Sequence, residues 1–590
     1  MIRRGSVPLA VAILTAAAFV PTLSGSFLNW DDNVNFLDNP AYRGLDREHV
    51  RWAFTSVSFG HYIPLTRLTW SLNWVLGAMN PWGYHLVNVL LHAINAGLLY
   101  FVARRLLAAA TADGAQAGRR DPDLCAAAAI AALVFGMHPL RVEPVAWITG
   151  RPDVLCASFV LLTACVYLRA VETDGPARRG LILVAALTLA AALLSKGAAL
   201  PFVGALLLLD VYPLGRLRRL GVRSLLIEKL PLLLVTLAGA GAIIHALRQG
   251  AVLTQISEHG SLARLAAAAH TFLIAPFRVI WPASLSPLYE LPARIDPLEP
   301  RFAVALLGVV LVTAGLIRLR RRWPGGLAAW TFSVLMLAPT SAVMRQGADL
   351  APDRYTYLSG MGFAVLVGGG ALCLIRLVRQ GTLTRFTGRA AAVAGVIAMV
   401  SLGATSWSYA QVWRESETLW RWAVEVDPDC SICHGKLGES ALGGPAGRTR
   451  VVEAEALFRR AIALRPDLPD AYYNLGTTLA LQGRYAEAEA PLRTYLERVP
   501  SSASGAERLG LVYLLQRRYE PAVPLLRTAF VLKPRTADLR DYLVQALEGQ
   551  AQELRAQGRG GEAETLLAEV RAVSALPLEA VPASGASPRS

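Results

Sequence analysis

Long apolar runs fill the chain up to residue 410, whereas residues 411–590 alternate polar and apolar positions as soluble helices do. A helix that crosses a bilayer needs about 20 mostly apolar residues. Measured against that length, the runs predict about eleven spanning helices, near residues 7–24, 85–106, 124–138, 153–170, 180–196, 198–213, 229–247, 302–318, 326–343, 356–377 and 390–408. The pattern therefore predicts an all-α chain, in which a polytopic transmembrane helix bundle precedes a helical part in water.

Arginine clusters between the apolar runs predict which loops share a side. Cytoplasmic loops carry an excess of Lys and Arg, and Arg3 and Arg4 before an uncleaved first span place the N-terminus in the cytoplasm. If each predicted span crosses the membrane in turn, six arginine clusters lie in the cytoplasm. They are Arg104/Arg105, Arg119/Arg120, Arg178/Arg179, Arg216–Arg223, Arg318–Arg322 and Arg376–Arg389. The outer side then receives a long first loop (25–83), a second loop (138–153), the 195–197 turn and a fourth loop (344–357).

The segment Leu262–Trp281 is apolar enough to span but contains two arginines, a histidine and a proline. Counting it as a span would move the Arg318–Arg322 cluster away from the cytoplasm. We therefore interpret it as an in-plane or re-entrant element on the outer side, which places the part after residue 410 outside the cytoplasm.

Composition supports the membrane assignment and narrows the partners. Hydrophobic residues make up 54% of the chain and charged residues 17%, against about 25% charged in soluble proteins, so the lipid bilayer is an expected partner. The net charge of +15 comes from the cytoplasmic clusters, and nucleic-acid binding is not expected. Frequent Arg and Ala indicate a bacterium, which predicts an integral inner-membrane protein whose outer segments are periplasmic.

A spacing of 34 residues organises the C-terminal part. It relates Leu475, Leu509 and Leu543, the glycines that follow the first two, and Pro466, Pro500 and Pro534. This period is the tetratricopeptide signature, in which each helix pair leaves an apolar face that the next pair buries. We expect a membrane domain at 1–410, a linker helix at 411–428, about four repeats at 429–575 and a disordered tail at 576–590.

Several motifs in a fixed order resemble those of one family. They are WDD at 30–32, HPLRVEPVAWITGRPD at 138–153, LLSKG at 193–197, DRYTYLSGMGF at 353–363 and the terminal repeats. The chain is similar in these motifs to the transmembrane and tetratricopeptide-repeat O-mannosyltransferases and their bacterial relatives, which belong to the GT-C glycosyltransferases. The resemblance covers most of 25–370 and the repeats. It departs from the family pattern at Ile63, Gly197 and Ser359, where relatives often have Arg, Glu and Pro.

The resemblance implies a polyprenyl-phosphate sugar donor, an acceptor hydroxyl on the outer side and a catalytic base directly after the first span. That position is Asp31 here, with Asp32 as the alternative. A base that takes the hydroxyl proton accelerates the attack on the sugar. Taken without the resemblance, the two carboxylates are equally compatible with a hydrated acidic turn beside Trp30.

The leaving phosphate needs cations or hydrogen-bond donors. Lys196, Arg354 and Arg151 lie on outer segments against the positive-inside trend, so we expect them to bind the donor phosphate. Snorkelling of each side chain toward the lipid headgroups is the alternative.

In the second loop we expect His138, Glu143 and Asp153 to support the candidate site. We expect a structural hydrogen bond between Glu143 and Arg151 rather than a metal site, because hard cations need several converging oxygens. Cys430, Cys433 and His434 match the C-x-x-C-H pattern of haem attachment, but no second axial ligand is evident. A local disulfide and two reduced thiols both stay open there, and no cofactor is expected.

We therefore predict an inverting membrane glycosyltransferase that moves a sugar, mannose by resemblance, from a polyprenyl-phosphate donor to a protein Ser or Thr hydroxyl on the outer side. The repeats would bind the acceptor protein. The alternatives are a catalytically silent, membrane-anchored tetratricopeptide scaffold for envelope protein assembly, and a polymerase or ligase of lipid-linked oligosaccharide.

Overall fold

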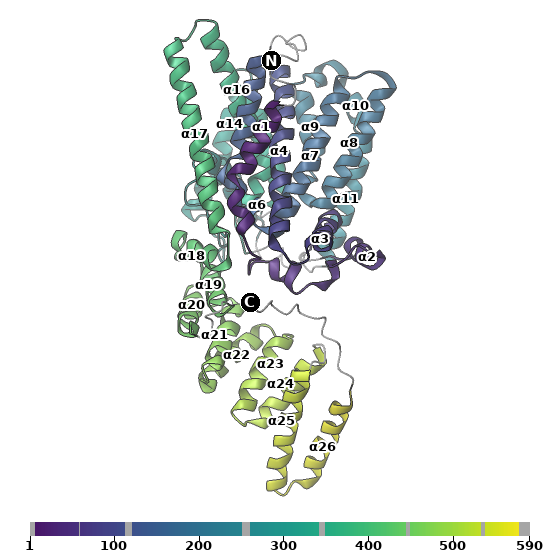
Figure 1. Cartoon of the computed structure of the whole chain (residues 1–590), viewed down its shortest axis with the longest axis vertical. Coiled ribbons are helices and arrows are strands. Elements are labelled where there is room, and N and C mark those ends of the chain that lie inside the picture. Colours follow the sequence, from purple (N-terminus) through teal and green to yellow (C-terminus); the bar gives the residue numbers. More distant parts are fainter. Residues whose placement is uncertain are drawn as a thin grey trace. The chain divides into compact units, whose positions relative to one another are not determined.

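The computed structural model describes residues 6–57, 60–111, 121–249, 260–341, 348–443, 449–532 and 537–576. Within these ranges the chain is helical apart from turns, links and one isolated bridge between Glu290 and Asp349 (Figure 1). The chain divides into two compact units, Met1–Leu419 and Trp420–Ser590. The division falls inside the segment expected as a linker helix, while most of the expected tail at 576–590 lies outside the described residues.

A helix lies at each predicted span of the first unit. The helices are α1 (Ser6–Ala18), α2 (Arg47–Thr55), α3 (Pro64–Gly77), α4 (Pro81–Ala110), α5 (Pro122–Gly136), α6 (Val142–Ala146), α7 (Arg151–Val171), α8 (Gly175–Ser195), α9 (Phe202–Val211), α10 (Arg216–Glu228), α11 (Leu230–Gln249), α13 (Ser261–Ile280), α14 (Pro300–Leu319), α15 (Pro324–Leu337), α16 (Thr356–Arg379) and α17 (Arg385–Val412). Of the described helices, eight are long and apolar enough to cross a membrane, or nine if α5 and the bent segment after it form one span. The number of about eleven spans stays a prediction, because α1, α9 and α15 are shorter.

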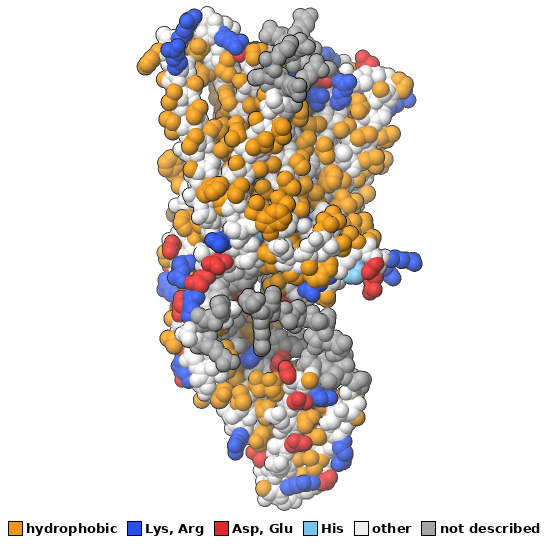
Figure 2. Space-filling model, viewed as in Figure 1, with side chains coloured by type: hydrophobic (Ala, Val, Ile, Leu, Met, Phe, Trp, Pro, Cys, Tyr) orange, Lys and Arg blue, Asp and Glu red, His pale blue; other side chains and the backbone are white. Residues whose placement is uncertain are grey.

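The links between these helices gather at two ends of the first unit. One end, here called the arginine end, joins α4, α5, α7 and α16 through the ion pairs Arg105–Glu172 (3.6 Å), Arg376–Asp121 (3.3 Å) and Arg379–Asp123 (2.9 Å). Figure 2 shows Lys and Arg side chains gathered there above a hydrophobic surface. The other end, here called the loop end, holds residues 25–80, 138–153, 195–199 and 349–355. The arginine clusters thus share one end, as predicted, although Arg119 and Arg120 lie outside the described residues.

A polar stripe on α4 positions the second loop and α7. Asn88 donates through Nδ2 to the carbonyl of Trp147 at 3.1 Å, and Asn95 donates to that of Val154 at 2.8 Å. These residues, with His92 between them, lie one or two turns apart and therefore on one helix face. Amide side chains inside a membrane bundle need such partners, because an unpaired polar group there is costly. The stripe consequently fixes the position of the second loop along the axis of the bundle.

Helix α13 is long and apolar enough to span, yet its contacts lie at the loop end. Thr271 Oγ1 donates to the Leu350 carbonyl at 3.2 Å, and Arg278 Nη1, two turns later, donates to the Ala351 carbonyl at 2.6 Å. Near its start, Ala266 is buried in one cluster with the same two loop residues. A crossing helix of 20 residues separates its ends by about 30 Å. The two hydrogen bonds to one short loop agree with the in-plane interpretation, which stays a prediction because α13 also packs along α14 and is itself long enough to cross.

The second unit is built from consecutive antiparallel helix pairs. Its helices are α18 (Ser416–Val426), which begins in the first unit, then α19 (Ser431–Gly443), α20 (Val451–Leu464), α21 (Pro469–Leu481), α22 (Tyr485–Arg498), α23 (Ala503–Leu515), α24 (Tyr519–Leu532), α25 (Ala537–Ala556) and α26 (Gly560–Ala575). A Cβ on Gly476 would meet Leu492 at 2.5 Å, and one on Gly510 would meet Leu526 at 2.8 Å. The repeated glycine therefore allows the two helices of a pair to approach closely.

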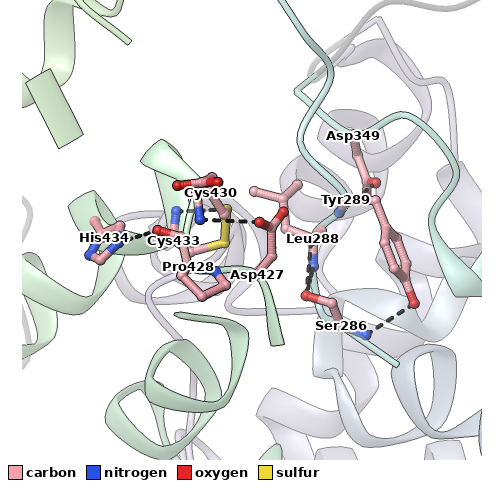
Figure 3. The surroundings of a disulfide bond; sticks show 10 residues. Ser286, Leu288, Tyr289, Asp349, Asp427, Pro428, Cys430, Cys433 and His434 are labelled. Carbon is pink, nitrogen blue, oxygen red and sulfur yellow. Dashed lines mark hydrogen bonds between the residues drawn. A yellow bond between two sulfur atoms is a disulfide. The ribbon is translucent and has the colours of Figure 1, made fainter. Parts of the chain in front are cut away.

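Cys430 and Cys433 form a disulfide at the start of α19 (Figure 3). Both cysteines are buried, and His434 directs Nε2 to the carbonyl of Pro428 at 3.0 Å. The structure therefore selects the disulfide from the two states left open by the sequence. With both sulfurs joined to each other, neither forms a thioether to a haem.

Candidate functional site

Asp32 pins the first loop to the second. Its carboxylate accepts hydrogen bonds from the Leu28 amide (2.9 Å), the Thr149 amide (3.1 Å) and Thr149 Oγ1 (2.6 Å), and the side chain is fully buried. Burial raises the pKa of the Asp32 carboxyl to about 7, against the three hydrogen bonds that lower it. Its neighbour Asp31 stays partly exposed. Of the WDD carboxylates, Asp32 is therefore the one that joins the two loops, and Asp31 is the one with part of its side chain accessible.

We expect the stability of the protein to fall as the pH rises from about 4 to 7. The folded pKa of Asp32 lies above the unfolded value of 3.8, so the folded state holds this proton more tightly, and ionisation of the buried carboxyl costs stability up to pH 7. The separation of the two pKa values corresponds to at most about 4 kcal/mol. Thermal unfolding of the full chain between pH 4 and pH 8 measures the effect, and Asp32→Asn should flatten the profile. An unchanged profile in Asp32→Asn would assign the dependence to other groups.

Arg151 holds the first loop against α4. Its guanidinium is fully buried and donates to Asn88 Oδ1 (2.9 Å), Asn73 Oδ1 (2.5 Å), the Thr69 carbonyl (3.2 Å) and the Tyr84 carbonyl (2.8 Å). These oxygens belong to α3 and α4 and already occupy its planar fork. The structure thus places Arg151 as a buried link between α3 and α4, and its contact with the donor phosphate stays a prediction.

Glu143 pairs with Arg354, and the expected bond between Glu143 and Arg151 was wrong. Glu143 Oε2 accepts from the Arg354 amide at 2.8 Å, and Oε1 accepts from the Arg354 guanidinium. Asp349 Oδ2 adds a second carboxylate 3.4 Å from the same guanidinium. The prediction failed because it favoured a partner eight residues away, whereas the fourth loop folds back onto the second.

Lys196 pairs with Asp153 in the first turn of α7. Its Nζ lies 2.6 Å from both carboxylate oxygens, and the two side chains are 17% and 10% exposed. The Thr66 hydroxyl of α3 donates to the Ser195 carbonyl at 3.0 Å, so the first loop also contacts this turn. The lysine expected in a tight turn between helices is therefore anchored, with part of its side chain still accessible.

His138 links the second loop to α13. Its Nδ1 accepts from the Leu140 amide at 3.2 Å, which caps the short helix after it, and its Nε2 lies 2.9 Å from the Val279 carbonyl of α13. The three supporting residues of the second loop thus face three different partners. Among the described residues, no three His, Cys, Asp or Glu side chains gather as metal ligands would.

Sequence reasoning missed Arg141, which lies between two of the residues that it selected. The buried guanidinium lies over the rings of Phe135 (4.9 Å) and Tyr357 (5.5 Å) and donates to Thr356 Oγ1 at 3.3 Å. A Cβ on Gly360 would come within 2.4 Å of Nη2, so the glycine makes room for it. An arginine on an outer loop was the signal that selected Arg151 and Arg354, and it applies equally here.

The segment that leads out of the first unit, at residues 414–416, is bonded to the first loop. The Ser26 amide donates to the Arg414 carbonyl at 2.8 Å, and the Asn29 amide donates to Ser416 Oγ at 2.9 Å. Together with the contacts above, these bonds join the first loop, the second loop, the 195–197 turn and the fourth loop at one end. The second loop is the common partner, because it contacts each of the other three segments.

Comparison with known proteins identifies relatives of both units. A family model for a tetratricopeptide repeat matches residues 447–503. Protein O-mannosyl-transferase TMTC4 of Homo sapiens is 26% identical over 492 residues, which cover 73% of this chain and 63% of the relative. Protein O-mannosyl-transferase Tmtc2 of Drosophila melanogaster is 39% identical over 210 residues, 34% of this chain and 21% of the relative. The chain is a relative of the TMTC protein O-mannosyl-transferases.

The match confirms the family resemblance and the all-α class with tetratricopeptide repeats. The chain spans about a fifth of the length of the TMTC2 proteins that it matches, including the one from Mus musculus at 33% identity over 179 residues. Among solved structures, ArnT from Cupriavidus metallidurans bound to undecaprenyl phosphate aligns with a TM-score of 0.36 and 16% identity, covering 84% of this chain and 79% of ArnT. MamA from Desulfovibrio magneticus RS-1 aligns with a TM-score of 0.22 and 18% identity, covering 27% of this chain and 85% of MamA.

Proposed function

We propose that this chain is a GT-C-type membrane glycosyltransferase that transfers a hexose from a polyprenyl phosphate to a protein Ser or Thr hydroxyl at the loop end. The TMTC relatives are named protein O-mannosyl-transferases, which supports mannose as the sugar. The observation that carries the proposal is the division of labour in the WDD motif. Asp32 is buried and bonded to Thr149 of the second loop, while Asp31 is partly exposed, and the same second loop holds Lys196 through Asp153 and Arg354 through Glu143.

In the proposed reaction, Asp31 takes the proton of the acceptor hydroxyl. The hydroxyl oxygen forms a bond to the anomeric carbon on the face opposite the phosphate, and the bond from that carbon to the phosphate oxygen breaks. The electron pair stays on the polyprenyl phosphate, which leaves as an anion, and the configuration at the carbon inverts. Lys196 and Arg354 stabilise the charge that develops on the phosphate, a contribution that is large when donors are positioned beforehand.

The ion pairs of Lys196 and Arg354 are compatible with this role. Lys196 is held by one carboxylate and Arg354 by two, so an entering phosphate would be a second anionic partner for Lys196 and a third for Arg354, and neither side chain would first have to be ordered. Arg354 offers several parallel donors suited to phosphate oxygens, while Lys196 offers a compact charge. The carboxylates Asp153 and Glu143 thus position the two cations before the donor binds.

The purified full chain should transfer mannose from a polyprenyl-phosphate donor to a Ser- and Thr-containing peptide. The amount of radiolabelled mannose incorporated into the peptide measures transfer. NMR of the anomeric centre of the product shows whether the configuration has inverted. A nucleotide-linked mannose serves as the control donor and should give no transfer. If the chain binds envelope proteins through residues 420–576 but transfers sugar from neither donor, the scaffold interpretation replaces this one.

We also propose that the loop end and the repeats are periplasmic and that the arginine end is cytoplasmic. The disulfide between Cys430 and Cys433 supports this side for the repeats, because disulfides persist in oxidising compartments and are rare in the cytosol. The arginine clusters at the opposite end of the first unit agree with the positive-inside rule.

A cysteine at Ser504, in α23, should react with a membrane-impermeant maleimide in intact cells. Arg389→Cys, exposed at the arginine end, is the matched control and should react only after the membrane is opened. The unmodified chain reports the background from native thiols. The reverse pattern would place the repeats in the cytoplasm and contradict the proposed orientation.

A further inference from the structure

A large apolar cavity lies inside the first unit, between α4, α7, α9, α15 and α16. Its volume is about 900 Å³, near the upper limit of the roughly 300–1,000 Å³ of small-molecule sites. Leu99, Val160 and Met361 line it toward the loop end, and Arg376 and Gln380 line it at the arginine end. Along α16 this is a distance of about 28 Å, close to the thickness of the hydrocarbon core of a bilayer.

The wall along α16 is shaped by three consecutive glycines. Gly368 lets α16 approach α5, since a Cβ there would lie 2.7 Å from the Ala127 carbonyl, whereas a Cβ on Gly370 would meet no atom within 4 Å. Gly369 and Gly370 both line the cavity. A glycine inside a helix is less favourable than an alanine. Gly370 makes no close contact with another helix, so we infer that the absence of a side chain there keeps the cavity open.

The arginine end of the cavity is basic and interfacial. Arg322 and Trp323, in the link between α14 and α15, line it together with Arg376 of α16. Arg322 is exposed, Trp323 is 48% exposed, and Arg376 pairs with Asp121 at 3.3 Å. Tryptophan concentrates at the depth of the lipid headgroups. Basic pockets between membrane helices on the cytoplasmic side bind anionic lipid headgroups.

We propose that this cavity binds an anionic phospholipid of the leaflet at the arginine end, with its phosphate between Arg322 and Arg376 and its acyl chains along Gly369 and Gly370. Most of the lining is apolar, and hydrocarbon chains are the apolar material that a bilayer supplies. The site differs from the donor site, because Arg354 lies about 30 Å from Arg376 along α16. The proposal does not depend on the transfer reaction.

Native mass spectrometry of the full chain in detergent tests the occupant. Equal amounts of phosphatidylglycerol, phosphatidylethanolamine and a polyprenyl phosphate are added, and the fraction of protein that retains each lipid is measured. We expect phosphatidylglycerol to be retained at least fivefold more than phosphatidylethanolamine. Arg322→Gln with Arg376→Gln should remove that preference, while Arg385→Gln with Arg389→Gln, also at the arginine end but outside the cavity, should leave it unchanged.

A second variant tests the acyl-chain part. Gly370→Leu fills the cavity and raises the helix propensity of α16, so a loss of lipid cannot be attributed to a weakened helix. It should lower phosphatidylglycerol retention at least fivefold. Gly395→Leu, at an equally open position on α17, is the matched control and should change nothing. Equal retention of both phospholipids, or retention of polyprenyl phosphate alone that Gly370→Leu abolishes, would overturn the proposal.

Discussion

Replacing Asp31 by Asn should lower sugar transfer by about 10²- to 10⁴-fold, the range that a positioned general base contributes. The amide keeps the size of the side chain but cannot accept the hydroxyl proton. Because Asp31 is partly exposed, the thermal stability of the protein should not change. The loss should appear in kcat, measured with the polyprenyl-phosphate donor and a saturating peptide acceptor.

Two other carboxylates of the same loop provide the controls for Asp31. Asp38 is exposed, and Asp38→Asn should retain full transfer. Asp32→Asn disturbs the buried bonds to Leu28 and Thr149, so it should alter stability together with transfer. Full activity of Asp31→Asn would remove the proposed base, and equal losses in Asp31→Asn and Asp38→Asn would point to a general effect of loop charge.

The largest effect on stability is expected at the buried pair of Glu143 and Arg354. Glu143→Gln leaves the Arg354 guanidinium buried, and within the described part of the chain Asp349, at 3.4 Å, is its remaining ion-pair partner. Loss of one partner of a buried ion pair costs about 3–5 kcal/mol. Arg354→Gln should cost a similar amount, since it leaves the Glu143 carboxylate unpaired. Urea unfolding of the full chain measures both values.

The double variant Glu143→Gln with Arg354→Gln separates structure from catalysis. It removes both charges of the Glu143–Arg354 pair, so it should regain part of the lost stability, while Asp349 still lacks its arginine partner. It should not regain transfer, because the donor phosphate still lacks the arginine. If transfer returns with stability, Arg354 has only a structural role. Arg105 and Glu172, 3.6 Å apart and partly exposed at the arginine end, are the comparison pair, whose loss should cost no more than about 1 kcal/mol.

The helices of the first unit were predictable because each must present many consecutive apolar residues to lipid. A helix therefore occurs at every predicted span, even where α9 is short. Whether α13 crosses the membrane or lies in its plane was harder to predict, since its length and hydropathy meet those of a crossing helix. Only contacts with residues far along the chain, such as Leu350, distinguish the two arrangements.

The candidate site was predictable in its members but less so in its pairings. Positive charge on loops expected outside the cytoplasm drew attention to Lys196 and Arg354, which form ion pairs at the loop end. It gave the same weight to Arg151, which is buried between α3 and α4. Nothing in a sequence states that Glu143 lies next to a residue 211 positions away. Thr149 carries no charge, so its bond to Asp32 gave no signal at all.

The bonds that tie Ser26 and Asn29 to Arg414 and Ser416 set an order of events during synthesis. Chains grow at about 5–20 residues per second, so the first loop exists for about 20 to 80 seconds before these partners are made. Throughout that time Asp31 belongs to a loop whose final anchors do not exist. In a nascent chain, every proposed site residue is therefore synthesised before the residues that complete the site. A chain truncated before Arg414 should never form the completed site.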